Sequence, residues 1–436
     1  MNRKVRIMMV KKIYYDFLIG FKTLQKKFVW IAVILCYLTV ISVTFIERYT
    51  LLSYSSNDFL SRLIDVSCWT IYILALLSGT FIISSCCSYP YNNLSLNRVL
   101  RSCRLETLLS VTPTLVDFSE SSDKKEKLLT FDDEGIPISK WEEKKEFIES
   151  NLNIRIIDIF YTSGVRRLSI RFVPATDAIP CKVQWSDAFI QKDKDAFPVV
   201  LGVSLTGEIY INLCLQNSIL IGGSTGSGKT MLLKNLVYQT CKLGAMVTII
   251  DLKGGIDFSK KYWKEHCTII TTKQEALASV DNIIKVMNQR KILFLKEQVS
   301  DISTYNACHR SDSLSHVVLA CDEIASLLDV KGLSKAEKDI TVILTSKLSE
   351  VARLGRAFGV HLIIATQRPD ATVIDGQIKN NIDCRICGRA DQVLSKIILD
   401  TTEAATRIPK NSQGRFLLSD GTEFQGYWMN EDDAYG

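Results

Sequence analysis

Three polar segments, each directly after an apolar run, carry the residue types that phosphate chemistry requires. The first is GSTGSGKT at residues 223–230, which matches the phosphate-binding pattern G-x-x-x-x-G-K-[ST]. Its small residues let successive backbone N–H groups curl around phosphate oxygens, and the amino end of the following helix adds partial positive charge. Lys229 is predicted to reach the β and γ phosphates of ATP, and the Thr230 hydroxyl to bind Mg²⁺. The predicted nucleotide-binding residues are therefore Gly223, Ser224, Thr225, Gly226, Ser227, Gly228, Lys229 and Thr230.

The second segment is HVVLACDE at residues 316–323, an apolar run that ends in two acids. Asp322 at the carboxyl end of such a strand can hold Mg²⁺ through water, and Glu323 can orient and deprotonate the attacking water. This pattern is common on its own, but its position after a phosphate-binding loop favours the functional interpretation. The second acid also favours an ATPase over a protein that binds ATP only as a slow switch.

The third segment is VHLIIATQRP at residues 360–369. A polar residue that leaves a strand beside the acidic strand can touch the γ-phosphate. Gln367 is therefore predicted to be the sensor of hydrolysis. The alternative is that Gln367 is polar only because it ends a strand.

These segments need a scaffold that brings strand ends together, and the pattern from Asn217 onward provides one. Apolar strands alternate with long helices, which predicts an α/β domain with a mostly parallel sheet and helices on both faces. The predicted strands are 217–222, 246–251, 267–271, 316–321, 360–366 and 383–388, and the predicted helices are 229–243, 274–298 and 336–358.

The order of these segments resembles the motor domain of the FtsK/SpoIIIE DNA translocases. The resemblance extends roughly over residues 215–420 and rests on GSTGSGKT, IIDLKGG (249–255), VVLACDEIASLL (317–328) and LSEVARLGRAFGVHLIIATQRPDATVIDGQIKNNIDCRI (348–386). It implies a RecA-like P-loop NTPase that uses ATP and Mg²⁺ to thread double-stranded DNA. It also implies an oligomeric ring, typically a homo-hexamer.

In such rings each ATP site lies between two subunits and is completed by an arginine of the neighbour. The matching candidates in this chain are Arg353, Arg356 and Arg385. Arg353 and Arg356 are three residues apart in the helix before the sensor strand, and so occupy neighbouring positions on one helix face. The alternative for each arginine is an ordinary surface salt bridge.

The amino-terminal part of the chain predicts a membrane anchor. Two uncharged apolar runs, residues 28–46 and 66–87, each approach the ~20 residues that a helix needs to cross a bilayer, so two transmembrane helices are predicted. Buried core helices are the alternative, but these rarely stay uncharged for so long. Basic residues are abundant before the first run and follow the second, and only two lie in the loop between them. This asymmetry predicts a two-pass protein of the cytoplasmic membrane with both termini in the cytoplasm.

The bulk composition limits what can be concluded about partners and redox chemistry. Residues 1–27 carry eight basic side chains and one acid, so the net charge of +6 belongs to this end and does not indicate DNA binding. The thirteen cysteines have no disulfide-framework spacing and fit reduced, buried small hydrophobes. Cys384 and Cys387 form a C-x-x-C pair, but residues three apart on a strand point to opposite faces, which disfavours metal binding or pairing.

The predicted organisation runs from a basic leader to the motor. The segments are a basic cytoplasmic leader (1–27), a two-helix membrane anchor (28–87), a charged connector (88–150), a small β-rich module (151–213) and an ATPase motor domain (214–436). The β-rich module is predicted from short alternating apolar runs separated by Gly and Pro. It carries no motif for chemistry and is expected to dock on the motor or to mediate subunit contacts.

This architecture differs from that of the chromosome-segregation members of the family, which have more spans, a long linker and a DNA-reading module. Two spans and a compact motor are similar to the coupling ATPases of Gram-positive integrative and conjugative elements. The leading hypothesis is a membrane-anchored ATPase that delivers DNA to a conjugative transfer channel, with relaxase and transfer-channel proteins as candidate partners. The alternatives are a chromosome-segregation pump, a protein-export ATPase of the same superfamily, and a membrane receptor that uses ATP as a switch. Whether the DNA is single- or double-stranded stays open.

Overall fold

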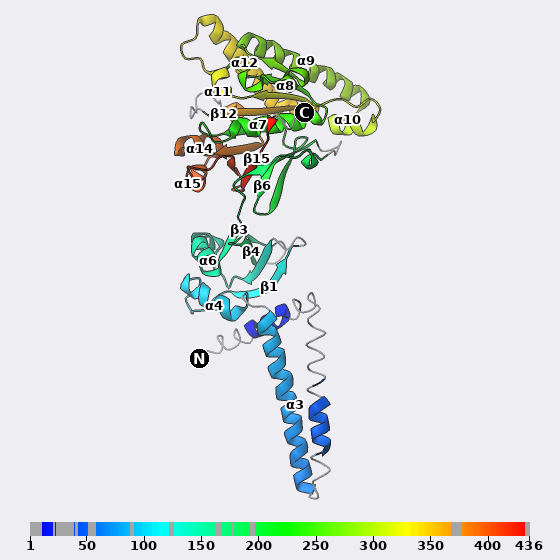
Figure 1. Ribbon diagram of the computed structural model, residues 1–436, viewed down its shortest axis with the longest axis vertical. Coiled ribbons are helices and arrows are strands. Elements are labelled where there is room, and N and C mark those ends of the chain that lie inside the picture. Colours follow the sequence, from blue (N-terminus) through cyan, green and yellow to red (C-terminus); the bar gives the residue numbers. More distant parts are fainter. Residues whose placement is uncertain are drawn as a thin grey trace. The chain divides into compact units, whose positions relative to one another are not determined.

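The chain, seen here as a computed structural model, divides into two compact units, Met1–Asp177 and Ala178–Gly436 (Figure 1). The residues that the structure describes are 11–20, 22, 39, 42–50, 58–87, 91–121, 126–162, 167–176, 178–191, 197–367 and 376–431.

The first unit contains a four-stranded antiparallel sheet with the strand order β1-β2-β4-β3. Its core includes Phe131 of β2, Trp141 of α5 and Phe172 of β4, all almost completely buried. The elements of this unit are α4 (Asn93–Ser102), β1 (Thr114–Glu120), β2 (Lys127–Asp132), α5 (Ile138–Glu143), α6 (Lys145–Leu152), β3 (Ile154–Tyr161) and β4 (Leu168–Pro174).

The structure groups these segments differently from the predicted charged connector and β-rich module. β1 and β2 fall within the predicted connector, yet β2 pairs directly with β4 of the predicted module. The apolar runs in β1 (TLVDFSE) and β2 (KLLTFD) are short and interrupted by polar residues. The composition of β1 and β2 therefore did not indicate strands, and only their pairing in the structure identifies them.

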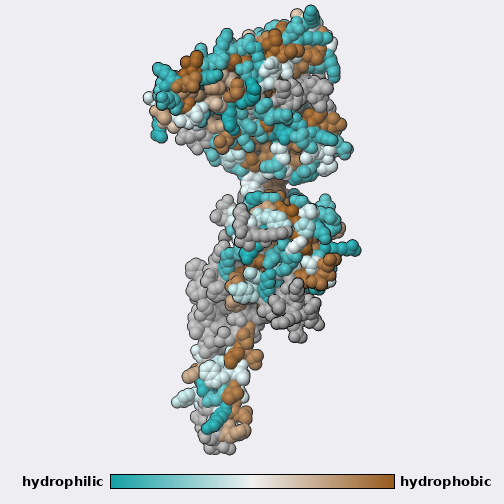
Figure 2. All heavy atoms as spheres, turned by 180° about the vertical axis from the view of Figure 1, so that it is seen from behind, coloured by the Kyte–Doolittle hydropathy of each residue, from teal (hydrophilic) through white to brown (hydrophobic). Residues whose placement is uncertain are grey.

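A long helix, α3 (Asp58–Cys87), contains the second predicted membrane span. Figure 2 shows hydrophobic side chains on the surface of this part of the chain. The exposed large apolar residues of α3 are Phe59, Leu63, Val66, Trp69, Ile71, Ile73, Leu74 and Leu77. Among the described residues, no helix combines the length and the apolarity that crossing a bilayer requires. The first predicted span, residues 28–46, lies largely outside the described residues. Both spans therefore stay predictions.

An 11-stranded mixed sheet forms the centre of the second unit, with the order β10-β9-β11-β12-β8-β13-β14-β15-β6-β7 and β5 beside β15. Its strands are β5 (Val183–Gln184), β6 (Pro198–Ser204), β7 (Gly207–Asn212), β8 (Ser218–Gly222), β9 (Met246–Ile250), β10 (Cys267–Ile270), β11 (Val317–Cys321), β12 (Val360–Thr366), β13 (Cys384–Gly388), β14 (Arg415–Leu418) and β15 (Glu423–Trp428). Its main helices are α7 (Lys229–Lys242), α8 (Lys261–His266), α9 (Lys273–Glu297), α11 (Ile324–Leu328), α12 (Lys335–Leu354) and α14 (Gln392–Leu399).

The α/β prediction is confirmed for the strands from β10 to β13, which are all parallel to their neighbours. Each of these strands begins and ends within one residue of its predicted bounds, and α7 and α9 also match closely. The expectation of a mostly parallel sheet is corrected, because β14, β15, β6 and β7 extend it in antiparallel pairing. The predicted β-rich module (151–213) includes β6 and β7, but the hydrogen bonds of these two strands make them part of the motor sheet.

Helices cover both faces of the parallel strands, and the strand residues alternate between two hydrophobic clusters. Leu220 packs on the face covered by α9, α12 and α14, whereas Ile219 and Ile221 pack on the face covered by α7 and α8. Cys387 and Cys384 likewise belong to opposite faces. The expectation that this C-x-x-C pair points to opposite sides of a strand is therefore confirmed.

The strand order positions the three polar segments of the sequence. β12 lies between β8, which precedes the phosphate-binding loop, and β11, which precedes the two acids. The register places Thr366 of β12 beside Gly222 of β8, and Ile364 of β12 beside Cys321 of β11. Because parallel strands end at the same edge of a sheet, all three segments meet there.

Candidate active site

The loop between β8 and α7 has a backbone that glycine makes possible. Gly228 ends it with φ of 97°, a left-handed conformation that favours glycine, immediately before α7 begins at Lys229. A Cβ atom on Gly228 would lie 2.9 Å from the backbone nitrogen of Gly414, and one on Gly223 would lie 2.5 Å from Ser227 Oγ. The loop is therefore packed closely enough that side chains at these two positions would disrupt it.

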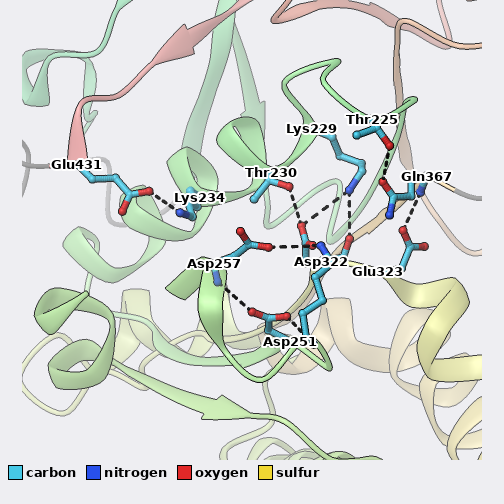
Figure 3. Close-up of polar contacts among 11 residues, drawn as sticks. Thr225, Lys229, Thr230, Lys234, Asp251, Asp257, Asp322, Glu323, Gln367 and Glu431 are labelled. Carbon is cyan, nitrogen blue, oxygen red and sulfur yellow. Dashed lines mark hydrogen bonds and ion pairs between the residues drawn. The ribbon is translucent and has the colours of Figure 1, made fainter. Parts of the chain in front are cut away.

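Lys229 and Thr230, the first two residues of α7, both contact Asp322 (Figure 3). Lys229 Nζ donates to the backbone oxygen of Asp322 at 3.3 Å and lies 3.8 Å from its carboxylate. Thr230 Oγ1 donates to Asp322 Oδ1 at 3.0 Å. The structure thus joins the predicted Mg²⁺ ligands Thr230 and Asp322, although they are far apart in the sequence.

Asp322 is buried, with 1% of its side chain exposed, yet it is surrounded by cations. Lys253 Nζ lies 2.6 Å from Asp322 Oδ2. Burial acts to raise the pKa of Asp322, but the charge of Lys229 and the hydrogen bond from Lys253 outweigh it and lower that pKa. Burial likewise acts to lower the pKa of Lys253, but its bond to Asp322 dominates and raises it. This carboxylate is therefore ionised, as a cation ligand must be.

Glu323 is held by the end of β12. Its Oε1 accepts a 2.8 Å hydrogen bond from Thr366 Oγ1, and its Oε2 accepts one of 3.0 Å from the backbone N–H of Gln367. Both carboxylate oxygens therefore have a donor, and the side chain is largely buried. A carboxylate that is fixed at both oxygens beside a phosphate-binding loop is suited to orient a water molecule and to accept its proton.

Gln367, the predicted sensor, bridges the two motifs. Its backbone holds Glu323, and its side-chain Oε1 accepts a 3.2 Å hydrogen bond from Thr225 Oγ1 of the phosphate-binding loop (Figure 3). This contact is possible because β12 lies between β8 and β11 in the sheet. The geometry therefore places Gln367 where it can couple the state of the loop to the position of the base.

These residues fit a nucleoside triphosphate with Mg²⁺. The loop provides a glycine-lined backbone cradle, and Ser227 Oγ is buried without a hydrogen-bond partner among the described residues. Lys229 supplies a cation, and the oxygens of Thr230 and Asp322 are the donor type that Mg²⁺ prefers. The site can thus hold phosphates, a hard cation and a water-activating carboxylate together.

The three arginine candidates do not lie at the site of their own chain. Arg353 lies in the last turn of α12 and Arg356 lies shortly after this helix, and both are exposed and precede β12. The seven residues of β12 separate them from the phosphate-binding edge by roughly 20 Å. Arg385, near the start of β13, pairs with Asp400, as its alternative interpretation expected.

Two basic residues of the site were missed or undervalued in the sequence. Arg389 directly follows β13, and its Nη2 donates to the backbone oxygen of Thr225 at 2.6 Å. Lys253 lies shortly after β9, and its Nζ donates to Asp322 Oδ2. Its position after a parallel strand was a usable signal, because β9 neighbours β11. Arg389 carried the same signal, because it directly follows a predicted parallel strand, but only the strand order reveals that β13 lies beside β8 and brings Arg389 to the phosphate-binding loop.

Comparisons with known proteins agree with this geometry. Residues 182–371 match the sequence model described as the FtsK/SpoIIIE family. The DNA translocase FtsK of Chlorobaculum tepidum is 32% identical over 225 residues, which cover 48% of this chain and 27% of that protein. The DNA translocase SftA of Bacillus subtilis is 32% identical over 237 residues, which cover 52% of this chain and 24% of that protein. The chain thus spans about a quarter of the length of these curated relatives.

A solved structure is similar over much more of its own length. It is the pCW3 conjugation coupling protein TcpA, in monomer form with ATPγS. The two proteins share 31% sequence identity with a TM-score of 0.58, and the match covers 79% of this chain and 97% of that chain. The similarity therefore extends beyond the segment that the family model matches.

Proposed function

Because the chain belongs to the FtsK/SpoIIIE family, we propose that it is a membrane-anchored ATPase that translocates DNA and delivers it to a conjugative transfer channel. The observation that carries the proposal is the meeting of Lys229, Asp322 and Glu323 at one edge of the parallel strands. A fixed carboxylate beside a phosphate-binding lysine is the arrangement that hydrolysis of a phosphoanhydride requires.

The residues of the site have separable roles in this hydrolysis. The backbone of the phosphate-binding loop and Lys229 bind the phosphates, while Thr230 and Asp322 would hold the cation. Bound Mg²⁺ would supply neutralisation of the charge on the β and γ phosphates. Glu323 orients the attacking water and accepts its proton. The bonds from Thr366 and Gln367 keep the Glu323 carboxylate in place for that step.

Gln367 is proposed to connect hydrolysis to movement. Its side chain contacts Thr225 in the loop, and its backbone contacts Glu323. A change at the γ-phosphate would therefore be transmitted to the end of β12 through two hydrogen bonds. A buried central strand moves as a rigid element, so such a change can be passed on rather than absorbed locally.

A ring of identical subunits, proposed as a hexamer from family membership, agrees with the position of two arginines. Arg353 and Arg356 lie at the opposite end of β12 from the site of their own chain. They are exposed and therefore available to a neighbouring subunit. An arginine supplied by a neighbour would stabilise charge that develops on the phosphates and would make hydrolysis depend on assembly.

Delivery of DNA to a conjugative channel is supported by the similarity to TcpA, a conjugation coupling protein, which extends over 97% of that chain. The membrane anchor is supported by the two uncharged runs and by the exposed apolar side chains of α3. Water does not favour a helix with so many exposed large apolar residues, whereas lipid does. The distribution of basic residues supports two passes with both termini in the cytoplasm.

The first experiment is ATP hydrolysis by the purified full-length chain, with and without double-stranded DNA, beside Glu323→Gln. The proposal expects hydrolysis that DNA stimulates and that the variant loses. Single-stranded DNA in a parallel assay would identify which form of the substrate is preferred. Normal transfer of the host element with Glu323→Gln would contradict the conjugative role. Hydrolysis that is indifferent to both DNA forms would contradict the DNA motor and favour activation by a partner protein.

A further inference from the structure

A short helix near the amino terminus exposes an apolar face and turns charged side chains inward. Residues 11–20 form this helix within the first unit (Figure 1). We propose that its outer face lies in the membrane–water interface, where it holds the first unit against an anionic lipid surface. This inference rests on the proposed function, because it assumes that the chain is anchored in a membrane.

The exposure of this helix is the reverse of that expected in water. The side that faces the unit carries Ile19, which is 2% exposed, but also the charged residues Lys12 and Asp16, both partly buried. At about 3.6 residues per turn, the exposed residues occupy the other side. They are all large and apolar: Ile13, Tyr14, Phe17 and Leu18. A surface helix in water has its polar side outward, so this arrangement indicates that the outer face contacts something other than water.

Polar contacts fix the orientation of the helix on the first unit. Asp16 Oδ1 accepts a hydrogen bond of 2.8 Å from the backbone N–H of Asn93 and one of 3.0 Å from its side-chain Nδ2. One turn earlier, Lys11 Nζ lies 2.7 Å from Asp132 Oδ2 at the end of β2. Contacts on successive turns prevent the helix from rotating about its axis. Its apolar residues are therefore kept on the outside by the fold.

The sequence keeps this helix close to both predicted membrane spans. The first uncharged run begins at Phe28, eight residues after Gly20, and the second ends at Cys87, six residues before Asn93. An extended chain spans at most ~3.6 Å per residue, so these connections reach no further than about 29 Å and about 22 Å. The contact between Asp16 and Asn93 therefore lies near the surface of the bilayer. A lipid surface is the apolar partner that the chain itself brings within reach of this face.

Exposed cations lie on and directly after the neighbouring helix α4: Arg98, Arg101 and Arg104. Lys12 donates a hydrogen bond to Asn97, the residue before Arg98. Burial lowers the pKa of Lys12 to about 8, and the charge of Arg101 acts in the same direction, so Arg101 lies close to the helix. Guanidinium groups beside an apolar face match anionic headgroups and the acyl chains beneath them. A symmetric contact with a second copy would instead bring like charges together.

The test places the photoreactive residue p-benzoylphenylalanine at Tyr14 of the full-length chain, reconstituted in phosphatidylcholine vesicles with or without phosphatidylglycerol. After irradiation, mass spectrometry identifies what is joined to this position. Phospholipid should be the main adduct, and its yield should rise severalfold with phosphatidylglycerol. Phe147 of α6 is the matched control, because it is an exposed aromatic residue of the same unit outside the apolar face. The same replacement at Phe147 should give about tenfold less lipid adduct.

The other outcomes separate this inference from the proposed function. Adducts at Tyr14 with a second copy of the chain, or lipid yields that are equal at Tyr14 and Phe147, would overturn the interfacial helix. Equal lipid yields in the two kinds of vesicle would overturn the role of the arginines. Release of the wild-type chain from the vesicles by alkaline carbonate would instead overturn the membrane anchor of the proposed function, because a spanning protein resists this extraction.

Discussion

The two ends of the parallel strands bury polar groups in opposite ways. At the carboxyl ends, the Asp322 carboxylate is 1% exposed and is contacted by the cations of Lys229 and Lys253. At the amino ends of β11 and β12, the imidazoles of His316 and His361 are buried with Nδ1 and Nε2 2.9 Å apart. The first cluster is charged, whereas the second is a neutral pair.

The environment of each cluster explains this difference. Burial lowers the pKa of His316 to about 4, and the charge of Arg290 acts in the same direction. Burial, followed by the charges of His316 and Arg290, lowers the pKa of His361 well below its ordinary value. Among the described residues that shift the pKa values of the two histidines there is no acid, whereas at Asp322 the cations favour the ionised form. Buried charge contributes little net stability, so its concentration at one end indicates a binding function, and the neutral pair indicates packing.

The largest expected effect comes from Glu323→Gln at the charged end. Hydrolysis of ATP should fall about a thousandfold, because an amide cannot accept the proton of the attacking water. The melting temperature should change little, since the amide oxygen can still accept one of the two hydrogen bonds that reach this residue. A steady-state ATPase assay and a thermal denaturation curve would check both. If Glu323→Gln unfolds at a lower temperature but hydrolyses ATP at the normal rate, the role of Glu323 is structural and the functional assignment of the carboxyl ends is wrong.

A second effect is expected from the exposed arginines near the amino end of β12. Arg356→Ala should reduce hydrolysis about a hundredfold without weakening ATPγS binding, if the neighbouring subunit uses it to stabilise developing charge. Arg353→Ala tests the adjacent candidate. Arg385→Ala should instead lower the melting temperature only slightly, because Asp400 is largely exposed and keeps its ion pair with Lys379. Full activity in both Arg353→Ala and Arg356→Ala would remove these two residues as trans-acting arginines.

A third effect concerns the pH dependence of stability at the neutral end. An unfolded histidine titrates near pH 6.5, whereas His316 has a pKa of about 4 in the folded chain. The unfolded state therefore binds more protons between these values, and the free energy of unfolding should fall by on the order of 2 kcal/mol as the pH drops through this window. Above pH 6.5 the pair adds no pH dependence.

Thermal denaturation of the wild-type chain and of His361→Gln between pH 7 and pH 5 measures this term. The variant should show a shallower loss of stability, because one of the two buried imidazoles is gone. Its ATPase activity at pH 7.5 should be unchanged, since the pair lies far from Glu323. Parallel curves for the two proteins would show that the histidines are not responsible for the slope.

The smallest expected effect comes from Lys253→Met at the charged end. Lys253 and Mg²⁺ would neutralise the same Asp322 carboxylate, so they compete for it. Mg²⁺ with ATPγS should raise the melting temperature of Lys253→Met more than that of the wild-type chain. The difference should be only about 2 °C, because the Lys253 side chain is partly exposed. Lys261→Met is the control, since Lys261 pairs only weakly on the surface with Glu265. A smaller rise in Lys253→Met than in the control would show that the lysine assists magnesium binding instead.

Much of the fold and most of the charged end could be predicted from the sequence. The parallel strands are buried on both faces and therefore appear as short continuous apolar runs, which made their bounds recognisable. Glu323 and Lys229 follow such runs in motifs whose residue types are dictated by phosphate chemistry. The antiparallel half of the sheet was not predicted, because β6 and β7 precede β8 in the chain and only pairing with β15 places them in the same sheet.

The sequence alone therefore determined which residues could bind phosphate, hold a cation and activate water, because these roles depend on local motifs after local strands. The tertiary structure alone decided which distant residues join them. It placed β12 between β8 and β11, so that Gln367 contacts both Thr225 and Glu323. It also brought Arg389 to the phosphate-binding loop through β13. The physical reason is that strand order results from packing both faces of the sheet at once, which no single segment of the sequence encodes.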